Sequence, residues 1–183
     1  TETVAGIMQE LAALGSESIR KVLRNHGARD PFFGVRIGDM KPIVKRIKTN
    51  YELALGLYDT GNYDAMYLAG LIADDAQMTR RDLTKWAKQA QPGHCGSTVS
   101  WVAAGSPVGM EMARDWIESK EEKLASIGWF TWCSLLALKP NDELDSAELQ
   151  KMLNLVQKTI HQAPDKVRSA MNMFVISLAI YVG

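Results

Sequence analysis

The chain has 183 residues, 46% of them hydrophobic, with 21 basic and 21 acidic side chains, so it can bury a sizeable core within one domain. Its two cysteines, Cys95 and Cys133, stand far apart with no Cys/His cluster, which argues against a disulfide framework and a structural zinc site. No apolar run approaches the roughly 20 residues that span a bilayer, and the N-terminus lacks a signal-peptide pattern, so we expect a cytoplasmic protein with no membrane partner.

Helix signals recur from the N-terminus onward. Apolar residues over positions 4–14 keep a period near 3.6 residues, which predicts a first helix. Ser16 can cap a second helix that continues to His26. A basic helix follows from about Asp39, because Pro42 is tolerated only in the first turn of a helix.

Capping residues mark the beginnings of the later helices. Asn62 can cap one of them, and Ser106-Pro107 is typical of an N-cap followed by proline at the first helical position. Capping-box spacing occurs at Thr79–Asp82, Ser119–Glu122 and Asp145–Glu148.

The fold class follows from these signals together with the absence of strand patterns. No alternating β-branched run is bounded by hairpin residues, and the apolar stretches are rich in Ala, Leu and Met. We therefore expect an all-α protein of about ten short helices. Helix pairs at intervals of roughly 35 to 40 residues favour an α-solenoid, a HEAT-like α-α superhelix, over a four-helix bundle. No linker divides the chain, so we expect a single HEAT-like helical-repeat domain over residues 1–183.

Charge is balanced overall but unevenly distributed. Residues 16–48 hold nine basic and three acidic side chains, a net charge of +6, and the remainder of the chain carries −6. Such asymmetry is typical of nucleic-acid binding, although a solvated helix face gives the same pattern. The residues we expect to contact DNA are Arg36, Lys41, Lys45 and Lys48.

Catalytic motifs are scarce. The three histidines are isolated, and no metal-ligand spacing, nucleotide-binding loop or hydrolase motif occurs. Cys133 lies in an apolar stretch, which favours a core position over a nucleophilic role. We expect no metal and no cofactor, and the residues do not identify a catalytic group.

Aromatic and polar residues of the second half form a candidate concave site. Exposed tryptophans could stack on a sugar or base, although tryptophans at helical spacing more often fill a core. On the last helix, two polar residues four positions apart share one face and either cap neighbouring helices or line a groove. The members of this candidate site are Trp101, Trp129, Trp132, Arg168 and Asn172.

Several segments together resemble the AlkD-like DNA alkylation repair family, within the HEAT-like repeat DNA glycosylase superfamily. They are the Phe33-Gly34-Val35 turn before the basic helix, the Asp64–Asp74 helix, Thr98–Ala103, the Trp129 segment and Val167–Asn172. The resemblance implies helix pairs that cradle duplex DNA. It also implies removal of alkylated purines, in which a carboxylate stabilises the oxocarbenium-like sugar. The family usually continues with another helical repeat, so we expect the domain to be incomplete at its C-terminal end or completed by a partner.

The catalytic pattern of this family is not retained. Val99 stands nearest the position of the family's catalytic Asp, and residues 83–110 contain no Asp or Glu. The family's Trp-x-x-Arg is matched by Trp129–Trp132, which lacks the Arg, and Met173 stands near the family's second Trp. The sequence therefore resembles a divergent branch.

Two functions remain open from the sequence. One is a DNA-binding protein that recognises or excises alkylated bases; if active, it would be a DNA N-glycosylase for alkylated purines with duplex DNA as its partner. The other is a non-catalytic α-solenoid that acts as an interaction or scaffold protein for a protein or nucleic-acid partner.

Overall fold

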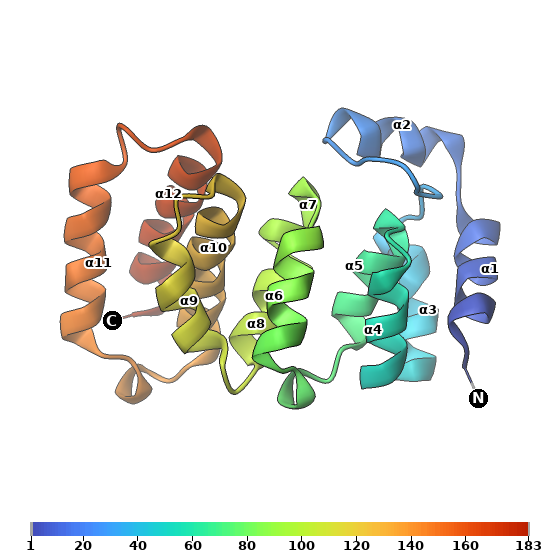
Figure 1. The fold of residues 1–183 in the computed structure, drawn as a ribbon, viewed down its shortest axis with the longest axis horizontal. Helices are drawn as coiled ribbons and strands as arrows, with labels where there is room; N and C mark the ends of the chain where they lie inside the picture. Colours follow the sequence, from blue (N-terminus) through green and yellow to red (C-terminus); the bar gives the residue numbers. More distant parts are fainter. Residues whose placement is uncertain (1, 183) are drawn as a thin grey trace. The chain divides into compact units, whose positions relative to one another are not determined.

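The structure, a computed structural model, describes residues 2–182 as α-helices joined by loops and two short 3₁₀ turns (Figure 1). This part of the chain contains no strand, so the all-α expectation is confirmed. Contacts between the helices divide the chain into two compact units, unit 1 (residues 1–94) and unit 2 (residues 95–183). The expectation of one domain stays a prediction. None of the helices between residues 2 and 182 is long and apolar enough to cross a membrane.

Unit 1 is organised around helix α5, which contacts α1, α3 and α4. Apolar side chains from all four helices, among them Leu11, Ile43, Leu57 and Leu68, are fully buried and form its core. The helices of this half of the chain are α1 (Val4–Leu14), α2 (Glu17–Asn25), α3 (Ile37–Ile47), α4 (Tyr51–Asp59), α5 (Tyr63–Ile72), α6 (Arg80–Gln89) and the short α7 (Pro92–Cys95), with a 3₁₀ turn at Asp75–Gln77.

Side-chain caps fix where several helices of unit 1 begin. The Asn62 side chain accepts a hydrogen bond from the Ala65 amide at 3.1 Å at the start of α5. At the start of α6, the side chains of Thr79 and Asp82 each accept from the other's backbone N–H. Both predicted caps are confirmed, and such caps satisfy amides that have no partner within the helix.

Helix α3 begins earlier than the sequence pattern predicted. It starts at Ile37 rather than near Asp39, so Pro42 lies in its second turn and not in the first. Since proline has no N–H, the carbonyl of Gly38, four residues earlier, receives no helical hydrogen bond from it. Gly38 is exposed, so water can satisfy that carbonyl.

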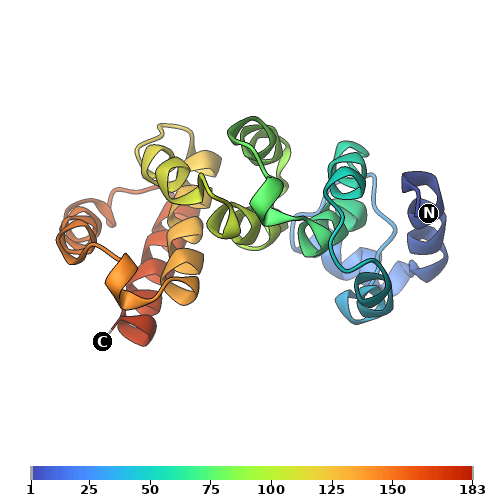
Figure 2. The same cartoon turned by 90° about the horizontal axis from the view of Figure 1, so that it is seen from below.

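Unit 2 is organised around the long helix α10, which contacts α8, α9 and α12. Figure 2 shows α10 and α12 side by side along their lengths. Trp129, Trp132 and Phe174 are among the buried residues at the centre of its core. The helices are α8 (Thr98–Gly105), α9 (Gly109–Ile117), α10 (Glu122–Leu138), α11 (Ser146–Thr159) and α12 (Asp165–Tyr181), with a 3₁₀ turn at Asn141–Glu143.

Helix lengths and starts in unit 2 differ in part from the predictions. Helices α10 and α12 each have 17 residues and are longer than the short helices that the sequence signals indicated. Ser106 does not cap α9; its hydroxyl donates to the Ala103 carbonyl at the end of α8. Ser119 does not cap α10, because its hydroxyl accepts from the Glu121 amide in the loop before that helix. The cap at Asp145 is confirmed, since its carboxylate accepts from two amides of α11.

Candidate nucleic-acid interface

The loop between α2 and α3 is held by one buried carboxylate. Asp64 lies on α5 and is 1% exposed. It accepts hydrogen bonds from the backbone amides of Phe33 at 2.6 Å, Gly34 at 3.0 Å and Val35 at 3.0 Å. Hydrogen bonds to a charged acceptor are stronger than those between neutral groups. The loop therefore enters α3 in a fixed position, and Arg36 follows directly after it.

Gly34 allows this loop to pack against α2. Its φ of 81° lies in the left-handed region, which favours glycine. A Cβ at this position would lie 2.6 Å from the Ser16 carbonyl oxygen and 2.7 Å from the Arg20 amide nitrogen. The Phe33-Gly34-Val35 turn is thus required by the packing of this unit, and it positions the start of the basic helix.

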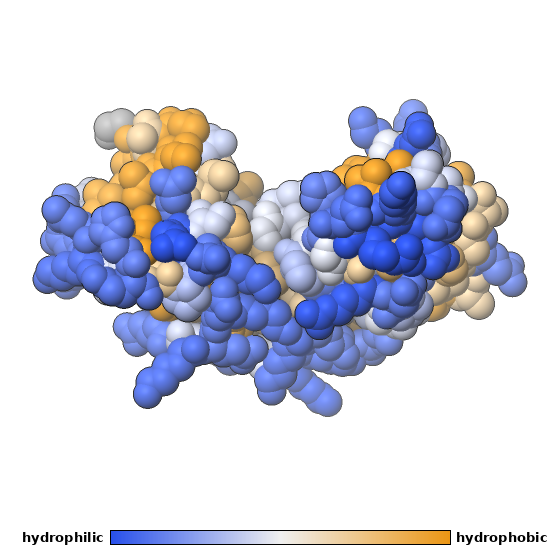
Figure 3. Space-filling model, turned by 90° about the horizontal axis from the view of Figure 1, so that it is seen from above, coloured by the Kyte–Doolittle hydropathy of each residue, from blue (hydrophilic) through white to orange (hydrophobic). Residues whose placement is uncertain are grey.

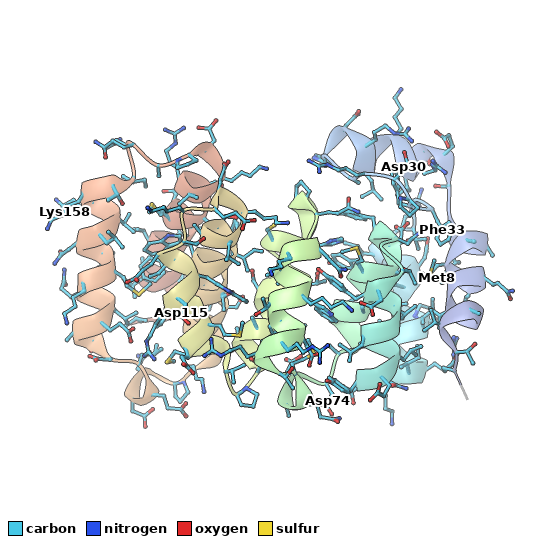
Figure 4. All side chains as sticks on the ribbon, in the orientation of Figure 1. Met8, Asp30, Phe33, Asp74, Asp115 and Lys158 are labelled. Atoms are coloured by element: carbon cyan, nitrogen blue, oxygen red, sulfur yellow. The ribbon has the colours of Figure 1, made fainter. Side chains whose placement is uncertain are left out.

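Part of the basic window serves the structure rather than a ligand. The guanidinium groups of Arg20 and Arg24 lie 5.1 and 5.4 Å from the ring centre of buried Phe32, and both pair with Asp30. Figure 4 shows Asp30 and Phe33 on this loop. Arg46 pairs with Glu10 at 2.6 Å and with a second glutamate of the N-terminal segment. Its hydrogen bonds to these carboxylates raise the pKa of Arg46. The charge of the window that is open to a ligand is correspondingly smaller than the sequence count.

The four predicted DNA contacts remain exposed on one element. Arg36 directly precedes the first residue of α3, and Lys41 and Lys45 lie four residues apart on one face of the helix. Lys48 directly follows the last residue of α3 and has a φ of 64°. The opposite face buries Met40 and other apolar residues. Among residues 2–182, none of these four cations forms an ion pair with a carboxylate. We call them the α3 basic face.

The residue that the sequence resemblance places nearest the family's catalytic carboxylate is apolar and buried. Val99 on α8 is fully buried. The exposed residues of α8 are Trp101, which is 41% exposed, and Gly105. Helix α8 therefore presents an aromatic surface without a carboxylate. An oxocarbenium-like sugar beside Trp101 would find no anion on this helix.

Two of the predicted site residues lie in the core and not in a groove. Trp129 is fully buried and packs edge-on against Phe174 with ring centres 5.2 Å apart. Trp132 is 1% exposed, and the Arg114 guanidinium lies 5.9 Å from its ring centre. Neither indole can stack on a base, so the core alternative holds for both, and Trp101 alone of the three reaches the surface.

Arg168 and Asn172 do meet at one surface feature. Together with His161, Asp165 and Ser169, among others, they line a shallow recess of about 500 Å³ at the start of α12. The Arg168 guanidinium donates to the Asp165 carboxylate. This pairing offsets the positive charge that Arg168 would offer to a phosphate.

The surroundings of His94 and Cys133 suit a structural role rather than a catalytic one. Buried His94 lies 3.3 Å from the Gln91 amide and 3.2 Å from the Tyr63 carbonyl oxygen, and burial lowers the pKa of His94 to about 4. Burial also raises the pKa of Cys133 to about 11, so its thiol is not a thiolate at neutral pH. The described part of the chain brings together no cluster of three metal-ligating residues.

The buried Asp64 clamp was not identified from the sequence. Its three donors lie about thirty positions earlier, so no short motif connects them. The sequence does offer one signal for this contact, namely the position of Asp64 directly after the Asn62 cap and at the start of an apolar helix. A buried aspartate in that setting needs hydrogen-bond donors.

Comparisons with known proteins agree with this fold. The family model described as DNA alkylation repair enzyme matches residues 7–181. Two uncharacterized proteins, Lin0241 of Listeria innocua serovar 6a and Lmo0209 of Listeria monocytogenes serovar 1/2a, are each 29% identical over 178 residues, which cover 94% of this chain and 76% of each relative.

A solved structure is also similar, with a TM-score of 0.94 and 40% sequence identity over 98% of this chain and 77% of the other. It is described as representing a new family of proteins related to the HEAT-like repeat DNA glycosylases with affinity for branched DNA structures. The expected HEAT-like helical-repeat fold is confirmed by this likeness.

Proposed function

Because the chain belongs to the DNA alkylation repair enzyme family, we propose that it binds DNA through the α3 basic face, with preference for branched DNA, and does not excise alkylated bases. The observation that carries the binding proposal is the exposure of Arg36, Lys41, Lys45 and Lys48, none of which forms an ion pair with a carboxylate among residues 2–182. The affinity of the 40% identical relative for branched DNA supports the choice of substrate.

Phosphate contact explains why this face suits DNA. Lys41 and Lys45 lie on one side of α3 and Lys48 lies at its C-terminal end, and each ammonium group can neutralise a backbone phosphate and release its counterions. Such contacts position DNA without reading its sequence. The Asp64 clamp fixes the loop before α3, so Arg36 is held at the beginning of the same row. We therefore expect binding that depends on salt and on DNA structure rather than on base sequence.

The absence of excision follows from the environment of α8. Removal of one preorganised group that stabilises a developing charge typically costs about 100- to 1,000-fold in rate. Val99 is buried where the family resemblance places a carboxylate, and residues 83–110 supply no replacement. Trp101 can contact a sugar or base but cannot neutralise a developing cation with a full negative charge.

A charge-reversal experiment tests the binding proposal. The triple variant Lys41→Glu/Lys45→Glu/Lys48→Glu should bind a labelled four-way junction and a linear duplex more weakly than wild type in fluorescence anisotropy. The slope of log K against log salt should fall in magnitude by about 0.9 for each phosphate that the variant no longer neutralises. The matched control is Lys120→Glu/Lys151→Glu/Lys158→Glu, which changes net charge equally at exposed positions of unit 2 (Lys158 is labelled in Figure 4). Equal weakening in both triple variants would mean that net charge, and not this face, governs binding.

A protein-interaction role is the second candidate, and one surface favours it. Met173, Val175, Ile176 and Ile180 on α12 are between 37% and 66% exposed. Figure 3 shows apolar residues gathered over the C-terminal part of this helix, while hydrophilic side chains cover most of the visible surface of unit 1. Exposed apolar patches often mark protein interfaces. If wild type binds neither DNA structure at low salt, this second function is preferred.

A further inference from the structure

Helix α6 carries a second basic surface on unit 1, and its orientation is fixed by core packing. Trp86 is fully buried and stacks on Tyr58 with ring centres 4.1 Å apart and planes inclined by 6°. The Tyr58 hydroxyl donates to the Trp86 carbonyl oxygen at 2.8 Å. Leu83 and Ala87 are buried on the same side of the helix. Because this face is held in the core, the residues on the other side of α6 must face solvent.

The outer face of α6 is basic over its whole length. Arg81, Lys85 and Lys88 are exposed and follow one another at intervals of four and three residues. A shallow surface recess of about 740 Å³ lies over this face. Its lining is formed by α6 residues, namely Arg80, Arg81, Thr84, Lys85, Lys88 and Gln89, and includes four cations and no carboxylate. We call this surface the α6 basic face.

Two carboxylates lie close to this face, and neither lines the recess. Asp82 belongs to α6, but its carboxylate accepts from Thr79 and from the Tyr51 hydroxyl, at 2.7 and 2.8 Å. Asp59 pairs with Lys85 at 2.6 Å, and both side chains are about half exposed. Exposed ion pairs contribute little to stability, so a phosphate can compete with Asp59 for Lys85.

The two basic faces lie on different sides of unit 1. Figures 1 and 2 both show α4 and α5 between α6 and α3. Helix α3 packs on α5 through its buried face, so its lysines point away from α5, whereas the cations of α6 point away from the Tyr58–Trp86 stack. A single straight duplex that lies along one face leaves the other unoccupied.

We propose that the α6 basic face binds a second duplex arm of a branched DNA while the first arm lies on the α3 basic face. This inference rests on the proposed function and assigns the preference for branched DNA to a particular surface. A four-way junction offers two arms with different directions, so it can neutralise cations on both faces. A linear duplex gains phosphate contacts on one face only. The α6 contacts then add affinity for the junction and none for the duplex.

A triple variant separates the roles of the two faces. Arg81→Gln/Lys85→Gln/Lys88→Gln should keep the wild-type affinity for linear duplex and lose the extra affinity for the junction. In wild type, the slope of log K against log salt should be steeper for the junction than for the duplex by about 2.7. Raising the salt concentration from about 0.05 to about 0.2 M should therefore weaken junction binding by about 40-fold more than it weakens duplex binding. In the variant the two slopes should coincide. A junction preference equal to that of wild type would overturn the inference.

A measurement on the unmodified protein makes the test independent of the variant's folding. Lysine acetylation followed by mass spectrometry should show Lys85 and Lys88 protected by the four-way junction and not by linear duplex. Lys41 and Lys45 should be protected by both. Equal reactivity of Lys85 and Lys88 with and without saturating junction would refute the α6 site even if α3 is protected. Failure of both DNAs to protect Lys41 and Lys45 would refute the proposed function instead.

Discussion

Replacing Asp64 by alanine should destabilise unit 1 far more than an ordinary surface substitution. The carboxylate accepts three backbone N–H groups, and those of Gly34 and Val35 are buried. A buried donor left without an acceptor costs about 1 to 3 kcal/mol, so loss of the acceptor for these two buried donors should lower the free energy of unfolding by about 2 to 6 kcal/mol. Typical domains have a total stability of about 5 to 15 kcal/mol, so the variant would be close to unfolding.

Urea denaturation followed by circular dichroism measures this effect, with Asp59→Ala as the matched control. Asp59 forms an exposed ion pair with Lys85, so its removal should cost less than about 1 kcal/mol. Native-state hydrogen exchange should show faster exchange of the amides of residues 33–35 in Asp64→Ala. If Asp64→Ala unfolds within about 1 kcal/mol of wild type, water or loop rearrangement satisfies these amides and the clamp does not fix the loop.

Three further predictions concern pH, backbone conformation and catalysis. The pKa of His94 is about 4 in the folded state and about 6.5 in the unfolded state. The stability that neutral His94 contributes is therefore complete above about pH 6.5 and is lost as the pH falls toward 4. The free energy of unfolding decreases by about 3 kcal/mol at most over this range. Urea unfolding at pH 7, 5 and 4 should show this decrease in wild type, and a smaller one in His94→Gln. Gly34→Ala should lower the free energy of unfolding by more than about 2 kcal/mol, because the new Cβ would meet backbone atoms at a residue whose φ is 81°. Gly61→Ala should lower it by only about 1 kcal/mol, because Gly61 has a φ of 69° but no atom within 4 Å of the new Cβ. Thermal melts of both variants test this contrast. Release of 7-methylguanine from methylated duplex should stay near the background rate. Any residual enhancement should depend on Trp101 or Arg168. Multiple-turnover release that persists in both Trp101→Ala and Arg168→Ala would show that the active site lies elsewhere.

Local sequence signals predicted the helices well where one side chain determines the boundary. Asn62 and Asp145 cap the helices that they were expected to cap, because the acceptor and its amide lie within three residues of each other. Ser106 and Ser119 have suitable side chains but bind other backbone groups. Whether a serine caps depends on where the preceding helix ends, and packing between helices determines that position.

The candidate site depended more strongly on contacts between distant residues. The exposure of Lys41 and Lys45 follows from helical periodicity, since the intervening apolar positions must face the core. Periodicity does not distinguish the exposed Trp101 from the buried Trp129, because aromatic residues at helical spacing suit a core and a groove equally well. Contacts across the fold, such as Asp64 with the loop before α3, are also absent from any local pattern.

The basic face of α6 shows a different reason for an incomplete prediction. Basic residues are densest along the sequence between residues 16 and 48, and α6 lies outside that window. In the structure, Arg20, Arg24 and Arg46 within the window are paired with acids. Lys85 of α6 is also paired, with Asp59, but the cations of α6 together line one recess. The charge open to a ligand depends on which carboxylates lie within reach, and that requires the fold.

Competition between DNA structures tests the central claim most directly. Wild-type protein bound to a labelled four-way junction is titrated with unlabelled linear duplex that has the sequence of one pair of arms. We predict that linear duplex displaces the labelled junction only at a large molar excess. Unlabelled junction should displace the labelled junction near equivalence. Displacement by linear duplex at the same concentration as by junction would contradict the claim that this chain prefers branched DNA.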